Sequence, residues 1–329
     1  EQMTMDGKIL RPILDEMAAR RMRITRDAEE RRRAVYAAIP RICEIDTELR
    51  TTPLAIMRAA FSQKKDAASQ LRAVRAHNLE LQKERAELLV AHGYAYDHLE
   101  PQYECRECED TGYLAPGEPC ACLREAYRKE LSERLCRQLG MTGEDTFGAF
   151  RLALYPKERQ GGAPSPYEQM SQVYDYCVEY SKHFGPDAAN LFFSGAPGLG
   201  KTKLAGCIAV EVARGGWGVV YGTAFEIFSA LEDKKFGRGG EDNDPARYTA
   251  CDLLVIDDLG SEMTTAFTVA AFYQLINERL LAGKKTILIS TCGVEELGRK
   301  YNAQLASRLR GEFVWLAFRG EDIREKLRK

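Results

Sequence analysis

The stretch Gly195-Ala-Pro-Gly-Leu-Gly-Lys201-Thr202 decides the fold class of this chain. It matches the pattern Gly-x-x-x-x-Gly-Lys-Ser/Thr, in which glycines let backbone N–H groups converge on phosphate oxygens. The apolar run Leu191-Phe-Phe193 precedes the loop, and a helical pattern begins at Lys203. The N-terminus of such a helix adds partial positive charge. The sequence therefore predicts a phosphate-binding loop between a buried strand and a helix, with ATP as the expected ligand.

Two residues of this loop have a defined chemistry with a bound nucleotide. Lys201 is expected to reach the β- and γ-phosphates, and the hydroxyl of Thr202 is expected to bind Mg²⁺. A chance glycine-rich turn is the alternative, but the flanking strand and helix and a second motif argue against it. The predicted nucleotide-binding set is Gly195, Ala196, Pro197, Gly198, Leu199, Gly200, Lys201, Thr202 and Lys203.

The second motif is Asp252-Leu-Leu-Val-Ile-Asp257-Asp258. Its four apolar residues place Asp257 at the carboxyl end of a buried strand, where ligands bind in parallel sheets. Asp257 is expected to hold Mg²⁺, usually through water, and Asp258 to orient or deprotonate the attacking water. Lys201, Asp257 and Asp258 are thus predicted to be catalytic in ATP hydrolysis. A strand-end cap is the alternative role for Asp258, and its short side chain predicts slow hydrolysis.

The C-terminal half alternates short apolar runs with helical patterns, as α/β proteins with parallel sheets do. The apolar runs are 191–193, 219–221, 253–256 and 286–289, and the helical patterns between them are 203–213, 224–233 and 267–281. Residues 167–329 are therefore predicted to form an α/β domain whose parallel sheet is covered by helices on both faces.

Residues 1–100 have a different composition, rich in Arg, Glu, Ala and Leu and poor in glycine. This composition indicates an all-α domain of long helices, with breaks expected near Pro40 and Pro53. Its charged faces are either simply solvated or provide a surface on which a partner protein docks. Residues 127–166 are expected to form a helix and a connector to the α/β domain.

Residues 101–126 hold Cys105 and Cys108, then Cys120 and Cys122. Four thiols at this spacing favour a tetrahedral Zn²⁺ site, which in so small an element would be structural and would drive local folding. The Cys-x-Cys pair is less usual than Cys-x-x-Cys, and an iron–sulfur cluster is the alternative. The other cysteines lie in apolar contexts and are interpreted as small buried side chains.

The composition of the whole chain limits the class of protein. Its 329 residues suffice for about two domains. The formal net charge of −2 means that any contact with nucleic acid must come from a local patch. We find no apolar run long enough for a transmembrane helix and no charged-then-apolar leader, so we expect a cytoplasmic protein without a membrane partner.

The motifs resemble those of bacterial replicative helicase loaders of the DnaC/DnaI type and of the similar IstB transposition helper ATPases. The resemblance covers roughly residues 101–329 and implies an AAA+ fold. It also implies a replicative DNA helicase and single-stranded DNA as partners, with self-association through the ATPase domain. The motifs that carry it are Tyr103-Glu-Cys-Arg-Glu-Cys-Glu-Asp-Thr-Gly112-Tyr113, Thr146-Phe-Gly-Ala-Phe-Arg-Leu152, Asp257-Asp-Leu-Gly-Ser-Glu262, Ile289-Ser-Thr-Cys292, Ala306-Ser-Arg308-Leu309 and Phe318-Arg-Gly-Glu-Asp-Ile-Arg324.

The resemblance also implies roles for residues outside the two phosphate motifs. Arg308 matches an arginine finger that reaches the ATP of a neighbouring subunit, with an exposed helix charge as the alternative. Arg324 matches a sensor-2-like position, with a charge on a polar tail as the alternative. At the sensor-1 position, where the family usually has Asn, this chain has Cys292. Thr291 is then the candidate that replaces the missing amide, because a thiol orients water poorly.

The stretch Lys234-Lys-Phe-Gly-Arg-Gly-Gly240 places three cations and one aromatic ring around glycine. This combination suits a loop that grips single-stranded DNA by phosphate contact and base stacking, although a solvated surface loop fits equally well.

Helicase loading in DNA replication is the leading functional hypothesis. An IstB-like transposition helper acting with a transposase and a zinc-bearing chaperone or unfoldase are the alternatives. An origin-binding initiator would require a helix-turn-helix after the ATPase domain.

Overall fold

The computed structural model describes residues 5–61, 67–115, 117–141, 146–159, 162–238 and 244–324. The chain divides into two compact units, the first formed by Glu1–Ile13 with Ala121–Lys329 and the second by Leu14–Cys120. No helix in the described ranges is long and apolar enough to cross a membrane.

The second unit is built mainly from three long helices, as the composition predicts. Helix α1 (Gly7–Ala38) is followed by α2 (Pro40–Phe61) and α3 (Ala67–Ala91), and the start of α1 belongs to the first unit. Proline suits the first turn of α2, where its missing N–H has no intrahelical partner. The expected break at Pro53 is wrong, because α2 continues through it. One lost hydrogen bond does not end a helix that also packs along a neighbour. A small core is formed by Val35, Ile39, Ile42, Leu89 and Leu99.

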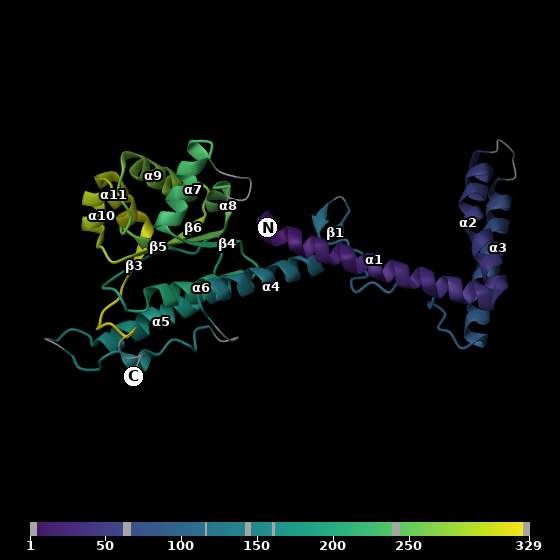
Figure 1. The fold of residues 1–329 in the computed structure, drawn as a ribbon, viewed down its shortest axis with the longest axis horizontal. Helices are drawn as coiled ribbons and strands as arrows, with labels where there is room; N and C mark the ends of the chain where they lie inside the picture. The colour runs from purple at the N-terminus through teal and green to yellow at the C-terminus, as the bar shows by residue number, and fades with distance from the viewer. Residues whose placement is uncertain are drawn as a thin grey trace. The chain divides into compact units, whose positions relative to one another are not determined.

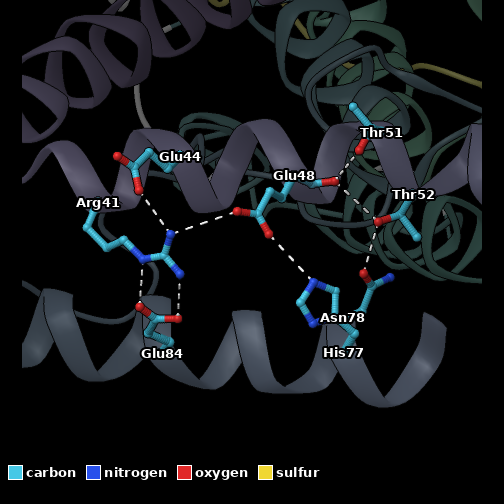
Figure 2. A network of polar contacts seen from close by, with 8 residues as sticks. All are labelled: Arg41, Glu44, Glu48, Thr51, Thr52, His77, Asn78 and Glu84. Carbon is cyan, nitrogen blue, oxygen red and sulfur yellow. Dashed lines mark hydrogen bonds and ion pairs between the residues drawn. The ribbon is translucent and has the colours of Figure 1, made fainter. Parts of the chain in front are cut away.

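Polar contacts join the facing sides of α2 and α3 (Figure 2). The guanidinium of Arg41 donates from Nε to Glu84 Oε1 at 2.8 Å and from Nη1 to Glu44 Oε2 at 2.9 Å. Further along the same two helices, the hydroxyl of Thr52 on α2 donates to Asn78 Oδ1 on α3 at 2.9 Å. Because these side chains lie at or near the surface, they set the register of the two helices more than they stabilise them.

The first unit contains a five-stranded, all-parallel sheet with strand order β4-β5-β6-β3-β7. The strands are β3 (Asn190–Ser194), β4 (Val219–Thr223), β5 (Leu253–Leu259), β6 (Lys285–Ser290) and β7 (Phe313–Ala317). The predicted α/β class is confirmed, and the central strands are buried on both faces as their continuous apolar runs require. Strand β7 was not among the four predicted strands.

Helices cover both faces of this sheet (Figure 1). Helix α6 packs with α4 and α5, and a core cluster joins α7, α9, α10 and α11 to the sheet. Helix α7 begins directly after β4, where a capping box between Thr223 and Glu226 satisfies its first N–H groups. The bounds of these helices are α4 (Ala121–Gln138), η1 (Leu152–Leu154), α5 (Pro166–Lys182), α6 (Lys201–Arg214), α7 (Ala224–Lys235), α8 (Ala246–Ala250), α9 (Ala266–Leu281), α10 (Val294–Lys300) and α11 (Ala303–Glu312).

Candidate nucleotide and metal sites

A cavity of about 700 Å³ lies at the carboxyl ends of β3, β5 and β6 in the first unit. In parallel sheets this is the edge at which ligands bind. It brings together the β3–α6 loop, the end of β5, the end of β6 and the C-terminal segment. The lining residues are Leu139, Gly140, Met141, Ala149, Phe150, Arg151, Leu154, Pro197, Gly198, Leu199, Gly200, Lys201, Thr202, Lys203, Asp258, Ile289, Ser290, Thr291, Ile323 and Arg324.

The loop between β3 and α6 needs glycine at two positions that lie against other segments of the same chain. Gly198 has φ of +76°, and a Cβ there would overlap the carboxylate of Asp322. Gly200 has φ of +80°, and its Cβ would lie 2.7 Å from the ring of Phe150. Both the backbone conformation and the close approach therefore exclude a side chain. The result is a loop whose backbone lies open to the cavity, as a phosphate cradle requires.

Lys201 is buried, with 7% of its surface exposed. Its Nζ donates to the carbonyls of Gly195 and Ala196, both at 2.7 Å. Burial lowers the pKa of this ammonium, and the carboxylates of Asp257 and Asp258 oppose that shift. The ammonium is thus held inside its own loop, next to the carboxylates at the end of β5.

Asp257 and Asp258 differ in their surroundings. Asp257 is 4% exposed, with its Oδ1 accepting from the backbone N–H of Asp258 at 2.8 Å and its Oδ2 from the hydroxyl of Tyr221 at 2.6 Å. Asp258 has φ of +54° at a register shift between β5 and β6, and its side chain lines the cavity. Burial, with a further contribution from Asp257, raises the pKa of Asp258. The strained backbone turns the second carboxylate toward the cavity.

These oxygen donors fit a magnesium ion. Mg²⁺ prefers hard oxygen ligands, and the hydroxyl of Thr202 with the carboxylates of Asp257 and Asp258 supplies such a set beside the phosphate cradle. Thr202 and Asp258 line the cavity, and Asp257 accepts a hydrogen bond from Tyr221 beside them.

The sensor candidates have separate positions. Thr291 follows β6 and lines the cavity, whereas Cys292 is not among the described lining residues. The backbone N–H of Cys292 donates to Ser290 Oγ at 3.0 Å, and burial raises the pKa of its thiol. Arg324 also lines the cavity, and its Nη2 pairs with Asp322 Oδ2 at 2.8 Å.

Arg308 lies elsewhere on the first unit. It is on α11, half-buried, with its guanidinium carbon 5.8 Å from the ring centre of Tyr273. The described lining of the cavity does not include it. The structure therefore does not bring Arg308 together with the other predicted catalytic residues within one chain.

Two residues that sequence reasoning missed support the site. The hydroxyl of Tyr155 donates to the carbonyl of Leu199 at 2.8 Å and so anchors the phosphate loop. Asp322 packs on Gly198 and pairs with Arg324. Asp322 lies inside the quoted terminal motif, which could have pointed to it, whereas Tyr155 has no sequence signal of its own.

The four predicted metal-binding cysteines come together. Their Sγ atoms all lie within 4.8 Å of one another, beside the short hairpin of β1 (Tyr113–Leu114) and β2 (Glu118–Pro119). The Sγ atoms of Cys105 and Cys120 are 3.7 Å apart. Tetrahedral zinc with Zn–S bonds of about 2.3 Å needs sulfurs separated by about 3.8 Å. The donor set and its spacing therefore fit zinc. The full set is Cys105, Cys108, Cys120 and Cys122.

A buried carboxylate organises the loop that carries the first two cysteines. Asp110 is 1% exposed and accepts from the backbone N–H groups of Glu104 at 3.1 Å and Cys105 at 3.0 Å. Glu109 and Asp110 both have positive φ, so the chain turns sharply just after Cys108.

The stretch predicted to contact DNA is only partly described, since residues 239–240 lie outside the described residues. Two of its cations are paired with acids: Lys234 Nζ with Asp244 Oδ1 at 2.7 Å and Arg238 Nε with Asp233 Oδ1 at 3.5 Å. The ring of Phe236 is exposed. The exposed ring suits base stacking, whereas the pairing reduces the net positive charge of the stretch.

Part of the chain that carries this site is similar to known proteins. Residues 177–309 match the family described as IstB-like ATP binding protein. The replicative helicase loader DnaC of Escherichia coli strain K12 is 26% identical over 151 residues, which are 45% of this chain and 62% of the relative. DnaC of Buchnera aphidicola subsp. Schizaphis graminum is 24% identical over 160 residues, covering 48% and 65%. The chain thus spans less than two thirds of the length of these relatives.

Solved structures are also similar. A crystal structure of the DnaC helicase loader aligns with a TM-score of 0.43 and 19% identity, over 54% of this chain and 100% of that chain. The match to the family model over residues 177–309 and to the DnaC relatives confirms the predicted resemblance.

Proposed function

We propose, from the IstB-like ATP-binding domain at residues 177–309, that this chain is an ATP-dependent helicase loader of DNA replication. The observation that carries the proposal is the cavity at the strand ends, where the phosphate loop, Asp258, Thr291 and Arg324 converge. Relatives named replicative helicase loader DnaC match 151 residues of this chain. ATP and Mg²⁺ are the expected ligands of the cavity.

Each residue of the site has a separate role in ATP hydrolysis. The ammonium of Lys201 exchanges its carbonyl partners for phosphate oxygens, which are stronger acceptors because they are charged. Thr202 and Asp257 hold Mg²⁺, which neutralises charge on the phosphates. Asp258 accepts a proton from, or orients, the attacking water, and its raised pKa makes it a stronger base than an exposed aspartate. Thr291 takes the sensor-1 role, and Arg324 leaves Asp322 to reach the phosphates.

Arg308 acts on a neighbouring subunit in this proposal. It is absent from the described lining of its own cavity, so its guanidinium completes a site only across an interface between copies of the chain. Hydrolysis then depends on self-association. An arginine supplied in trans contributes factors on the order of 10³–10⁵ to the rate in well-studied phosphoryl transfer.

The other parts of the chain bind partners. Residues 1–100 dock on the replicative helicase, because they form helices with solvated charged faces and lie outside the ATP-binding domain. The cysteine cluster in residues 101–126 binds structural zinc, and residues 127–166 link it to the ATPase domain at 167–329. The stretch from Lys234 contacts single-stranded DNA through its exposed Phe236.

The experiment that tests the loader function is co-purification of the full chain with the replicative helicase of its host, with ATP, with ADP and without nucleotide. Recovery of a complex that depends on ATP, and its loss in Lys201→Ala, would support the proposal. A chain that binds ATP but recovers no helicase under any condition would refute helicase loading.

A transposition helper is the second candidate, because the matching family model is described as IstB-like. The two functions differ in the DNA they bind. A loader should bind single-stranded DNA in preference to duplex, whereas ATP-dependent binding to duplex DNA in the same assay would favour the transposition helper.

A further inference from the structure

Tyr221 contacts Asp257, a residue of the proposed magnesium site. It is on β4, at the edge of the sheet, and pairs in register with Val255 of β5. Asp257 lies two residues further along β5 and so projects from the same face of the sheet as Val255. The long phenol ring of Tyr221 spans this diagonal and brings its hydroxyl to Asp257 Oδ2 at 2.6 Å.

This hydrogen bond links the neighbouring strands β4 and β5. The phenol has one proton and gives it to the carboxylate of Asp257.

Asp257 is anchored at both oxygens, by the N–H of Asp258 and by the hydroxyl of Tyr221. These two hydrogen bonds fix the plane of its carboxylate, and so the direction in which its remaining lone pairs point.

We infer that Tyr221 is a positioning residue for the magnesium of this site, orienting the Asp257 carboxylate. The inference rests on the proposed ATP and Mg²⁺ binding. It concerns Mg²⁺ and not the nucleotide itself, because the hydroxyl of Tyr221 bonds to Asp257, an expected magnesium ligand. Removing its hydroxyl should weaken the part of ATP affinity that Mg²⁺ supplies and leave metal-free affinity almost unchanged.

The test is Tyr221→Phe in the full chain, with binding of a fluorescent ATP analogue measured in Mg²⁺ and in excess EDTA. We divide the dissociation constant in EDTA by the dissociation constant in Mg²⁺. In Tyr221→Phe this ratio should be about tenfold lower than in the unsubstituted chain, as expected for the loss of one hydrogen bond to a charged group. Tyr180→Phe is the matched control, because it loses a buried hydroxyl that donates to the Ala189 carbonyl at 2.8 Å. This control should keep the ratio unchanged.

Two further measurements separate positioning from misfolding. Far-UV circular dichroism and the urea midpoint verify that Tyr221→Phe folds, and Tyr221→Leu replaces it if it does not. In an Asp257→Asn background, Tyr221→Phe should add less than it does alone, because the two act through one contact. An unchanged ratio in folded Tyr221→Phe would overturn the inference. If the unsubstituted chain binds no nucleotide, the proposed function itself fails.

Discussion

The guanidinium of Arg279 is a charged group in the core of the first unit that needs hydrogen-bond acceptors, because the side chain is 0% exposed. Its Nη1 donates to the carbonyls of Tyr248 at 2.7 Å and Cys251 at 2.9 Å, and its Nη2 donates to that of Lys285. Its Nε donates to Thr286 Oγ1 at 3.0 Å. These acceptors precede β5 and begin β6, so Arg279 holds together the two strands that end at the nucleotide cavity.

Arg279→Met removes the charge and keeps most of the length of the side chain. The carbonyls of Tyr248, Cys251, Asp252 and Lys285 then lose a donor, and each buried group left unsatisfied costs about 1–3 kcal/mol. Part of this destabilisation is offset, because Arg279→Met no longer has to bury a charged guanidinium and because water can enter to bind the carbonyls. We expect the free energy of unfolding to fall by about 3–5 kcal/mol, which lies in the upper range for single substitutions.

The assay is urea unfolding of the full chain followed by tryptophan fluorescence. Both tryptophans of the chain, Trp217 and Trp315, belong to the first unit, so the signal reports on the sheet and not on the helical unit. Arg310→Met is the control. Its exposed pair with Glu295 at 2.7 Å should contribute less than about 1 kcal/mol. A loss below about 1 kcal/mol in Arg279→Met, at unchanged urea dependence, would refute the reasoning.

Three other outcomes follow from the site and its surroundings. Protein purified without added zinc should contain about one zinc per chain, and Cys120→Ser should lower that content, as measured by metal analysis; iron or no metal would contradict the zinc assignment. Lys201→Ala should abolish ATP binding, and mixing it with Arg308→Ala should restore part of the hydrolysis if the arginine acts in trans, whereas no recovery would place Arg308 within its own subunit. Arg159 and the N–H of Ser165 lower the pKa of Glu168 from its ordinary 4.5 to about 2. Glu168 pairs with Arg159 and closes a capping box with Ser165 at the start of α5. The stabilisation that its carboxylate gives should therefore be present above pH about 4.5 and lost as pH falls through about 2. The difference in urea midpoint between the unsubstituted chain and Glu168→Gln should shrink between these two pH values, and a difference independent of pH would contradict this expectation.

Local motifs led directly to much of the fold and of the candidate site. Each apolar run predicted as a strand is a strand, because a strand covered on both faces needs continuous apolar residues. The cysteines meet because their spacing is short and the turn at Gly112 and Gly117 has positive φ. The break expected at Pro53 was wrong because a local rule was applied where packing along α3 sustains the helix.

Contacts between distant segments could not be inferred in this way. Nothing near Tyr221 in the chain indicates a partner, and its contact with Asp257 exists only because β4 and β5 pair in one register. The same holds for Asp322 on Gly198 and for Tyr155 on Leu199, which join segments more than 40 residues apart.

The amino-acid sequence by itself determined the phosphate loop, the strand that carries Asp257 and the thiol cluster, because each depends on residues close together in the chain. The tertiary structure alone decided which side chains orient those groups: Tyr221 beside Asp257, Asp322 beside Arg324, and Arg308 outside its own cavity. The physical reason is that strand register and helix docking set such contacts, and both follow from the packing of the whole sheet.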